Sequence, residues 1–190
     1  MRLGLFGGSF DPIHHAHLIL ARDAIEQFAL DRVIFIPAAI SPHKLMTVPA
    51  PAEVRRDMVA AAIAAEPRFG LNDSEIRRTG PSFTIDTVEE VRAAHPGAEL
   101  FYFIGEDNVA ALHTWRRIDE LRRLVRFVLF GRGESAAGAE FPRLARRIDI
   151  SATEVRHRVA RGQSIRYLVP EAVLDLIENH HLYQPASHQS

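Results

Sequence analysis

A glycine- and histidine-rich segment at residues 7–17 carries the side chains best suited to chemistry, in the order GGSFDPIHHAH. His14 and His17 are three residues apart at the expected start of a helix, so both rings can lie on one side while His15 points elsewhere. Two imidazoles beside the exposed N–H groups of a helix start could donate hydrogen bonds to phosphate oxygens as charge builds in a transition state. Spacing alone leaves a histidine-rich surface turn equally open.

Two other functions of this segment are disfavoured. A metal site would need a third ligand and supporting groups, and the neighbouring sequence offers no obvious acidic or thiolate partner. The dinucleotide fingerprint needs G-x-G-x-x-G, whereas residues 4–8 read GLFGG and the next apolar run ends without an acidic residue. We therefore expect no protein-bound metal ion and no dehydrogenase activity.

A second chemical segment, ISATEVR, lies near the carboxyl end at residues 150–156. It is expected to open a helix directly after a strand, as the first segment does. Ser151 and Glu154 have the spacing of a capping box, which explains both residues structurally. Arg156 is open to two interpretations: its guanidinium reaches back to an anion at the helix start, or it is solvated. A shared anion requires the two imidazoles and the guanidinium of Arg156 to meet around one cleft.

The elements that would position these segments alternate between strands and helices. Apolar runs predict strands at residues 3–6, 33–36, 69–71, 100–104, 127–130 and 147–149. Three-and-four spacing predicts helices at residues 17–28, 52–66 and 84–94, with further helices closing the chain. Residues 37–51 and 131–138 are expected to be loops. This order predicts an α/β fold: a doubly wound, Rossmann-like, mostly parallel sheet with helices on both faces and ligands at the carboxyl ends of its strands.

Composition sets the broad class. With 190 residues, we expect one domain over residues 1–184, including a C-terminal helical part at about 151–184, and a frayed tail at 185–190. The 23 basic and 24 acidic residues lack the basic excess of a nucleic-acid binder. No apolar run approaches the roughly 18 residues of a membrane span, and there is no cysteine, so we expect a cytoplasmic protein without membrane contact. The oligomeric state is not predicted.

Both chemical segments resemble motifs of one superfamily. Residues 7–17 resemble the signature of nucleotidyltransferases that carry an H-x-G-H or T-x-G-H motif, with Ala16 in place of the family's glycine. Residues 150–156 are similar to the superfamily's late I-S-[ST]-T-x-[IV]-R motif, with Ala152 as the departure. In that superfamily the late motif binds the ATP phosphates.

Three interior segments narrow the resemblance to the nicotinate mononucleotide adenylyltransferases. Residues 41–44 (SPHK) resemble that family's P-P-H-K, with serine for the first proline. Residues 80–87 (GPSFTIDT) resemble its G-P-S-Y-T-x-D-T, with Phe83 for tyrosine. Residues 105–108 (GEDN) and the only tryptophan, Trp115, resemble its G-x-D-N segment and downstream tryptophan. The matches keep the family's order over most of the chain, which makes chance agreement implausible.

The resemblance implies transfer of an adenylyl group from ATP, carried with Mg²⁺, to nicotinate mononucleotide, giving nicotinate adenine dinucleotide and pyrophosphate in NAD biosynthesis. The implied catalytic residues are His14, His17 and Arg156. The residues assigned to ATP are Gly7, Gly8, Ser9, Phe10, His14, His17, Gly105, Asp107, Ile150, Ser151, Thr153 and Arg156. The residues assigned to the mononucleotide are Lys44, Thr84, Trp115, Arg116 and Arg132.

Several of these assignments have a structural alternative. Trp115 offers a stacking surface for a pyridine ring, yet a lone tryptophan more often packs in a core. The backbone N–H of Thr84 could hold a carboxylate at a helix start. Asp107 could accept the ribose hydroxyls of ATP or simply cap a helix, and Lys44 could contact phosphate or be solvated.

Two rival functions stay open at this stage. A pantetheine-phosphate adenylyltransferase shares the first segment but is generally shorter and lacks the segments at Gly80 and Trp115. A nucleotide-binding regulatory module without turnover would fit the Ala16 and Ala152 departures. The preference for the acid over the amide mononucleotide rests on the resemblance alone.

Overall fold

Five strands form one parallel sheet in the computed structural model, which describes residues 1–39, 49–130, 140–144 and 146–185. They are β1 (Arg2–Gly8), β2 (Arg32–Pro37), β3 (Phe69–Leu71), β4 (Glu99–Gly105) and β5 (Val125–Phe130). Within the described residues their order is β3-β2-β1-β4-β5, and each neighbouring pair is parallel. The order reverses between β1 and β4, which is where doubly wound sheets bind ligands. The predicted fold class and five of the six predicted strands are confirmed.

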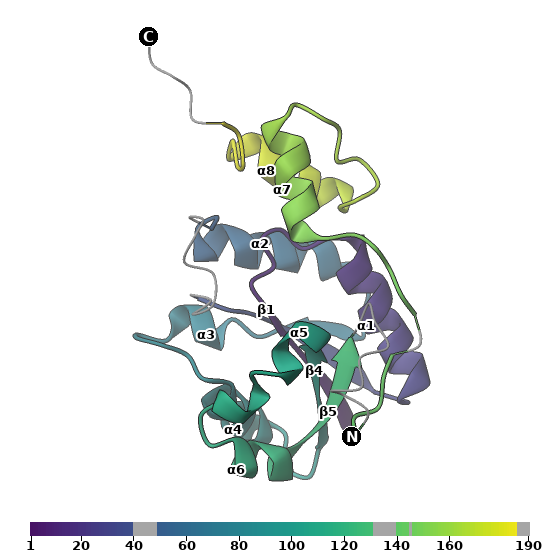
Figure 1. Ribbon diagram of the computed structural model, residues 1–190, viewed down its shortest axis with the longest axis vertical. Coiled ribbons are helices and arrows are strands. Elements are labelled where there is room, and N and C mark those ends of the chain that lie inside the picture. Colours follow the sequence, from purple (N-terminus) through teal and green to yellow (C-terminus); the bar gives the residue numbers. More distant parts are fainter. Residues whose placement is uncertain (40–48, 131–139, 145, 186–190) are drawn as a thin grey trace.

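Helices cover both faces of the sheet (Figure 1). They are α1 (His15–Gln27), α2 (Ala52–Ile63), α3 (Ser74–Arg77), α4 (Thr84–Ala94), α5 (Glu106–Val109), η1 (Leu112–Thr114), α6 (Ile118–Leu124), α7 (Ala152–Ala160) and α8 (Glu171–Asn179). One core cluster joins the sheet to α1, α2, α7 and α8, and a second joins it to α4 and α6. The three predicted helices are confirmed, although α1 begins two residues earlier and α2 ends three residues earlier than predicted. Helices as short as α3 and α5 have too few turns to show a periodicity.

β4 shows why its sequence is apolar without interruption. Phe101 and Phe103 belong to the core cluster under α1 and α2, whereas Leu100, Tyr102 and Ile104 belong to the cluster under α4 and α6. Successive side chains of a strand point to opposite faces, so a strand covered on both faces is apolar at every position.

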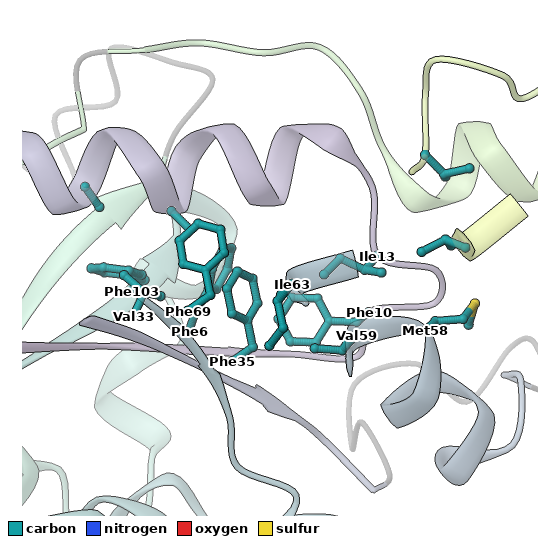
Figure 2. Packing of buried hydrophobic residues seen from close by; sticks show 14 of the residues in the cluster. Phe6, Phe10, Ile13, Val33, Phe35, Met58, Val59, Ile63, Phe69 and Phe103 are labelled. Atoms are coloured by element: carbon teal, nitrogen blue, oxygen red, sulfur yellow. The ribbon is translucent and has the colours of Figure 1, made fainter. Parts of the chain in front are cut away.

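Phenylalanine rings fill the space between the sheet and the helix layer of α1 and α2 (Figure 2). Phe6 of β1 lies at their centre, with its ring centroid 5.4 Å from Phe35 of β2, 5.7 Å from Phe103 of β4 and 4.9 Å from Phe130 of β5. Phe10, beyond the end of β1, packs its ring 5.5 Å from Phe6 in a T-shaped contact. The loop after β1 is therefore anchored in the core by its own side chain.

The predicted strand at residues 147–149 is wrong. Among the described residues, the sheet edge beside β5 is met by a single bridge, between Leu129 and Arg143; the Leu129 N–H donates to Pro142 O, and the Leu144 N–H donates to Leu129 O. The chain then leaves the sheet for α1, where Gln27 donates to Arg143 O at 2.6 Å and Arg146 pairs with Asp23. Without a strand partner, residues 147–149 form no ladder.

The C-terminal helices complete the layer beyond α2. α8 packs against α2, and its buried residues Val173 and Ile177 lie four positions apart on one face. None of the helices in the described parts of the chain has the length and apolar character needed to span a lipid bilayer.

Candidate active site

A cleft of about 1010 Å³ lies beyond the carboxyl ends of β1 and β4. Its wall includes thirteen of the residues predicted for the site: Gly7, Gly8, Ser9, Phe10, His14, His17, Thr84, Gly105, Trp115, Arg116, Ile150, Ser151 and Thr153. Arg156 does not line it. Lys44, Arg132 and the side chain of Asp107 lie outside the described residues; the backbone of Asp107 is in α5. The cleft therefore brings together segments from both halves of the chain.

The two glycines at the end of β1 are required by their neighbours. A Cβ on Gly7 would lie 2.5 Å from the hydroxyl oxygen of Tyr102, a distance that no side chain tolerates without a shift. A Cβ on Gly8 would lie 3.2 Å from the Phe10 ring. Phe10 itself has a left-handed backbone, with φ of 43°, held by a ring that is only 3% exposed. Close packing thus shapes the loop before any ligand arrives.

His14 and His17 do share one side of the helix start, as predicted. Their rings are stacked, with centroids 3.7 Å apart and planes 24° apart. The backbone N–H of His14 donates to Nδ1 of His17 at 3.2 Å. A neutral imidazole that accepts at Nδ1 carries its proton on Nε2. Because His17 lines the cleft, Nε2–H is the hydrogen-bond donor that it can offer to a bound anion.

The start of α7, near the carboxyl end of the chain, borders the same cleft. Ser151 is the N-cap of α7, and its Oγ accepts a hydrogen bond from the Glu154 backbone N–H at 3.1 Å, as predicted for half of a capping box. Ile150, Ala152 and Thr153 line the cleft beside it. Two helix N-termini, those of α1 and α7, therefore present their positive ends to one cavity.

Arg156, in α7, contacts both the start of its own helix and the loop between β1 and α1. Its Nη1 donates to the main-chain oxygen of Asp11 at 2.8 Å, and its Nη2 donates to Thr153 Oγ1 at 3.2 Å. The guanidinium thus contacts the backbone of the loop that leads from β1 to His14 and α1. The interpretation of Arg156 as a solvated side chain is excluded by these contacts.

The other end of the cleft combines aromatic and polar groups. Trp115 is half-buried and packs edge-on against Tyr102 and Phe127, with centroid distances of 6.0 and 6.3 Å. It therefore has the core contacts of the alternative interpretation and also lines the cleft, as the predicted role requires. Arg116 places its guanidinium carbon 4.6 Å from the centroid of the Phe83 ring. Thr84 is the first residue of α4, as predicted.

Burial controls the ionisation of two groups at this end. Burial raises the pKa of Tyr102 to about 12, against the effect of its hydrogen bond with Thr84. Burial also raises the pKa of Glu75, whose Oε1 accepts a hydrogen bond from Thr87 Oγ1 at 2.8 Å. Tyr102 is thus a neutral hydrogen-bonding group in the wall of the cleft. Neither residue was among the predicted site residues.

Arg55 of α2 is a further residue that the sequence reading missed. It is 2% exposed and donates to the carbonyl oxygens of Ser9, Ala38, Ala39 and Ala50 at 2.6 to 3.0 Å. Burial lowers the pKa of its guanidinium, opposed by the negative charge of Asp11. The available signal was its position on the buried face of α2, four residues before Val59 and three before Met58.

The donor set at the phosphate end suits an anion better than a metal ion. It includes the imidazoles of His14 and His17 and the hydroxyl groups of Ser151 and Thr153, and the Oδ1 atom of the nearby Asp11 carboxylate already accepts two hydrogen bonds from the protein, whereas Mg²⁺ prefers carboxylate and carbonyl oxygens. A search of the described residues finds no group of three histidine, aspartate or glutamate side chains that could hold a metal ion.

Known proteins share both the sequence and the fold of this chain. It matches the family model described as cytidylyltransferase-like over residues 5–158. A probable nicotinate-nucleotide adenylyltransferase of Thermus thermophilus is 44% identical over 188 residues, covering 97% of this chain and 100% of the relative. One of Lactiplantibacillus plantarum is 42% identical over 186 residues, covering 96% and 88%.

Solved structures of the Plasmodium falciparum nicotinic acid mononucleotide adenylyltransferase, complexed with NaAD and with APC, match with TM-scores of 0.76 and 0.74. Their identities are 18% and 20%; 96% of this chain and 97% and 96% of theirs are covered, so they support the fold. The curated relatives are far more similar and match over nearly their whole length. The chain therefore belongs to the cytidylyltransferase-like family and, within it, to the nicotinate-nucleotide adenylyltransferases.

Proposed function

We propose that this protein transfers the adenylyl group of ATP to nicotinate mononucleotide, giving nicotinate adenine dinucleotide and pyrophosphate on the route to NAD. One observation carries the proposal: a single cleft has two helix N-termini and an imidazole pair at one end and Trp115 with Thr84 at the other. The first end suits a triphosphate and the second a flat, anionic ring. The names of the relatives point to the same reaction.

The reaction we propose is a direct in-line displacement. A phosphate oxygen of the mononucleotide attacks the α-phosphorus of ATP, the bond from that phosphorus to the bridging oxygen of the β-phosphate breaks, and pyrophosphate leaves with the electron pair. No covalent enzyme intermediate is required. Such transfers depend mainly on positioning and on stabilising the charge of the transition state.

In this proposal the ATP phosphates are bound by residues at the starts of α1 and α7. Nε2–H of His17 donates to a phosphate oxygen as charge develops, and His14, stacked on it, acts beside it. Ser151 and Thr153 contribute the start of α7, and Arg156 holds that start against the first loop. Gly7, Gly8, Ser9, Phe10, Gly105, Asp107 and Ile150 complete the proposed ATP site.

The acceptor half is built around Trp115. Its exposed ring area faces the cleft while two ring edges hold it from behind, an arrangement that suits stacking of a pyridine ring. The backbone N–H of Thr84, at the start of α4, is proposed to bind the nicotinate carboxylate. Arg116 is proposed to add positive charge there, and Lys44 and Arg132 are proposed to contact the mononucleotide.

Magnesium is proposed to enter as part of the substrate, bound to the phosphates of ATP. When bound there, it would neutralise charge on the leaving pyrophosphate. We further propose that residues 1–184 act as one unit with the C-terminal helices included. A cytoplasmic location stays a prediction.

The proposed function is tested directly by comparing the acceptors that the protein uses. Purified protein is mixed with Mg·ATP and, in separate reactions, nicotinate mononucleotide, nicotinamide mononucleotide or pantetheine phosphate, and pyrophosphate release is measured. We expect the highest kcat/KM with nicotinate mononucleotide. Preference for pantetheine phosphate would instead establish the rival transferase. Binding of ATP without pyrophosphate release from any acceptor would refute the enzymatic proposal in favour of a regulatory module.

A further inference from the structure

The carboxylate of Asp11 is the buried charge closest in sequence to the catalytic imidazoles. Asp11 lies in the loop between β1 and His14 and is 7% exposed. Its Oδ1 accepts hydrogen bonds from Tyr183 Oη at 2.7 Å and from the backbone N–H of Ala50 at 3.2 Å. Its Oδ2 lies 4.0 Å from Nη1 of Arg156, which also donates to its main-chain oxygen. This residue therefore ties the first loop to three distant segments.

The most distant of those segments follows α8. Tyr183 is 172 residues beyond Asp11 in the sequence, yet its hydroxyl makes the shorter of the two hydrogen bonds to Oδ1. Burial and the negative charge of Asp11 raise the pKa of Tyr183, so its hydroxyl stays protonated and donates. A hydrogen bond to an ionised group is shorter and stronger than one between neutral groups.

We propose that Tyr183 is a positioning residue for adenylyl transfer: through Asp11 it holds the loop between β1 and α1, and with it His14 and the first turn of α1 that carries His17, in the productive geometry. The inference rests on the proposed function and extends it, because it makes the C-terminal end of the chain part of the catalytic framework. Tyr183 itself does not line the cleft. It acts on the reaction only through the position of the loop.

The expected effect on kcat follows from the position of the loop between β1 and α1, which leads directly into His14. A misplacement of about 1 Å in a catalytic group can cost on the order of a hundredfold in rate. The ring of Tyr183 packs against the core cluster of α1, α2 and α8, and Tyr183→Phe keeps that packing while removing only the hydroxyl. We therefore expect a loss of about ten- to a hundredfold in kcat, with the KM for each substrate changed by less than about threefold.

The matched control is Tyr167→Phe. Tyr167 lies in the same C-terminal part but is 83% exposed, and no described contact ties it to the cleft. Steady-state pyrophosphate release is measured for the unmodified protein, Tyr183→Phe and Tyr167→Phe. Tyr167→Phe should behave as the unmodified protein does. If the unmodified protein releases no pyrophosphate, the proposed function fails whatever Tyr183 does. If it does release pyrophosphate and Tyr183→Phe stays within threefold in kcat, only the positioning role fails.

A second arm separates positioning from a general loss of structure. In the His17→Ala background, loss of the Tyr183 hydroxyl should change kcat by less than about twofold, because a group it positions is already absent. An undiminished ten- to hundredfold loss in that background would overturn the proposal. Asp11→Asn, which weakens the same hydrogen bond from its other side, should reproduce the fall in kcat of Tyr183→Phe.

The third arm does not depend on turnover. The backbone N–H of His14 donates to Nδ1 of His17, so its hydrogen exchange reports the geometry of the loop. In Tyr183→Phe we expect this amide to exchange at least about tenfold faster while the amide of Leu5 in β1 keeps its rate. Equal acceleration at both amides would mean global destabilisation and would contradict the positioning role.

Discussion

His17 carries two nitrogen atoms with different expected roles, and two substitutions separate them. Nδ1 accepts the hydrogen bond from the His14 backbone and so caps α1, whereas Nε2 is the proposed donor to the phosphates. The amide oxygen of asparagine can take the place of Nδ1, and the amide nitrogen of the longer glutamine can take the place of Nε2. His17→Asn therefore keeps the cap and loses the phosphate donor, whereas His17→Gln keeps the donor, and a glutamine three residues after the N-cap can also accept from the N-cap backbone N–H.

The two losses differ in kind and in size. Removal of one preorganised donor to a transition state costs about 2.7–4 kcal/mol, or roughly a hundred- to a thousandfold in kcat. Removal of a helix cap costs about 1 kcal/mol of stability, which corresponds to a Tm lower by about 2–4 °C in a protein of this size. We expect the first loss in His17→Asn, at most a small part of the second in His17→Gln, and both in His17→Ala.

Two measurements on the same preparations decide the outcome: kcat from pyrophosphate release at saturating substrates, and Tm from thermal unfolding. His17→Asn should unfold within about 1 °C of the unmodified protein and be the slower enzyme of the first two variants, since only its donor is lost. A kcat for His17→Asn within tenfold of the unmodified protein would refute the assignment of Nε2. Equal losses of kcat in both variants would refute the division of labour between the nitrogens.

Three further predictions follow from the cleft wall. Trp115→Ala should raise the KM for the mononucleotide about five- to thirtyfold, because about 1–2 kcal/mol of stacking is lost, and leave the KM for ATP within threefold; the opposite pattern would exclude stacking. Burial raises the pKa of Glu75, so its contribution to stability is present below the ordinary glutamate pKa and is lost as pH rises through the raised one. The Tm of Glu75→Gln relative to the unmodified protein should therefore increase between pH 4 and pH 8, and a constant difference would contradict this. Gly7→Ala should lower Tm through the contact with the Tyr102 hydroxyl, and adding Tyr102→Phe should recover part of the loss; strictly additive losses would argue against that contact.

The central strands and the position of the first loop could be predicted because their causes are local. β4 is apolar at every position since both of its faces are covered, and the break in that pattern at Gly105 marks where the strand ends. The spacing of His14 and His17 places two rings on one side of any helix that begins there. The functional role of that loop could therefore be predicted without knowing which distant residues contact it.

The failed strand and the missed residues have long-range causes. Residues 147–149 were predicted as a strand, but the edge of β5 is already met by residues 142–144 and the chain continues along α1. Arg55 resembles any helical arginine until four carbonyl groups from two loops, those after β1 and after β2, surround it. Composition does not indicate which charged residue will be buried.

The sequence alone determined the alternation of strands and helices, the positions of the two helix starts proposed to bind anions, and the family to which their motifs belong. These features depend on backbone geometry and on side chains a few residues apart. Only the tertiary structure decided that Arg156 reaches the backbone of the first loop and that Tyr183 holds Asp11 across 172 residues. Such contacts depend on how packed layers bring distant segments together, and no local spacing encodes that distance.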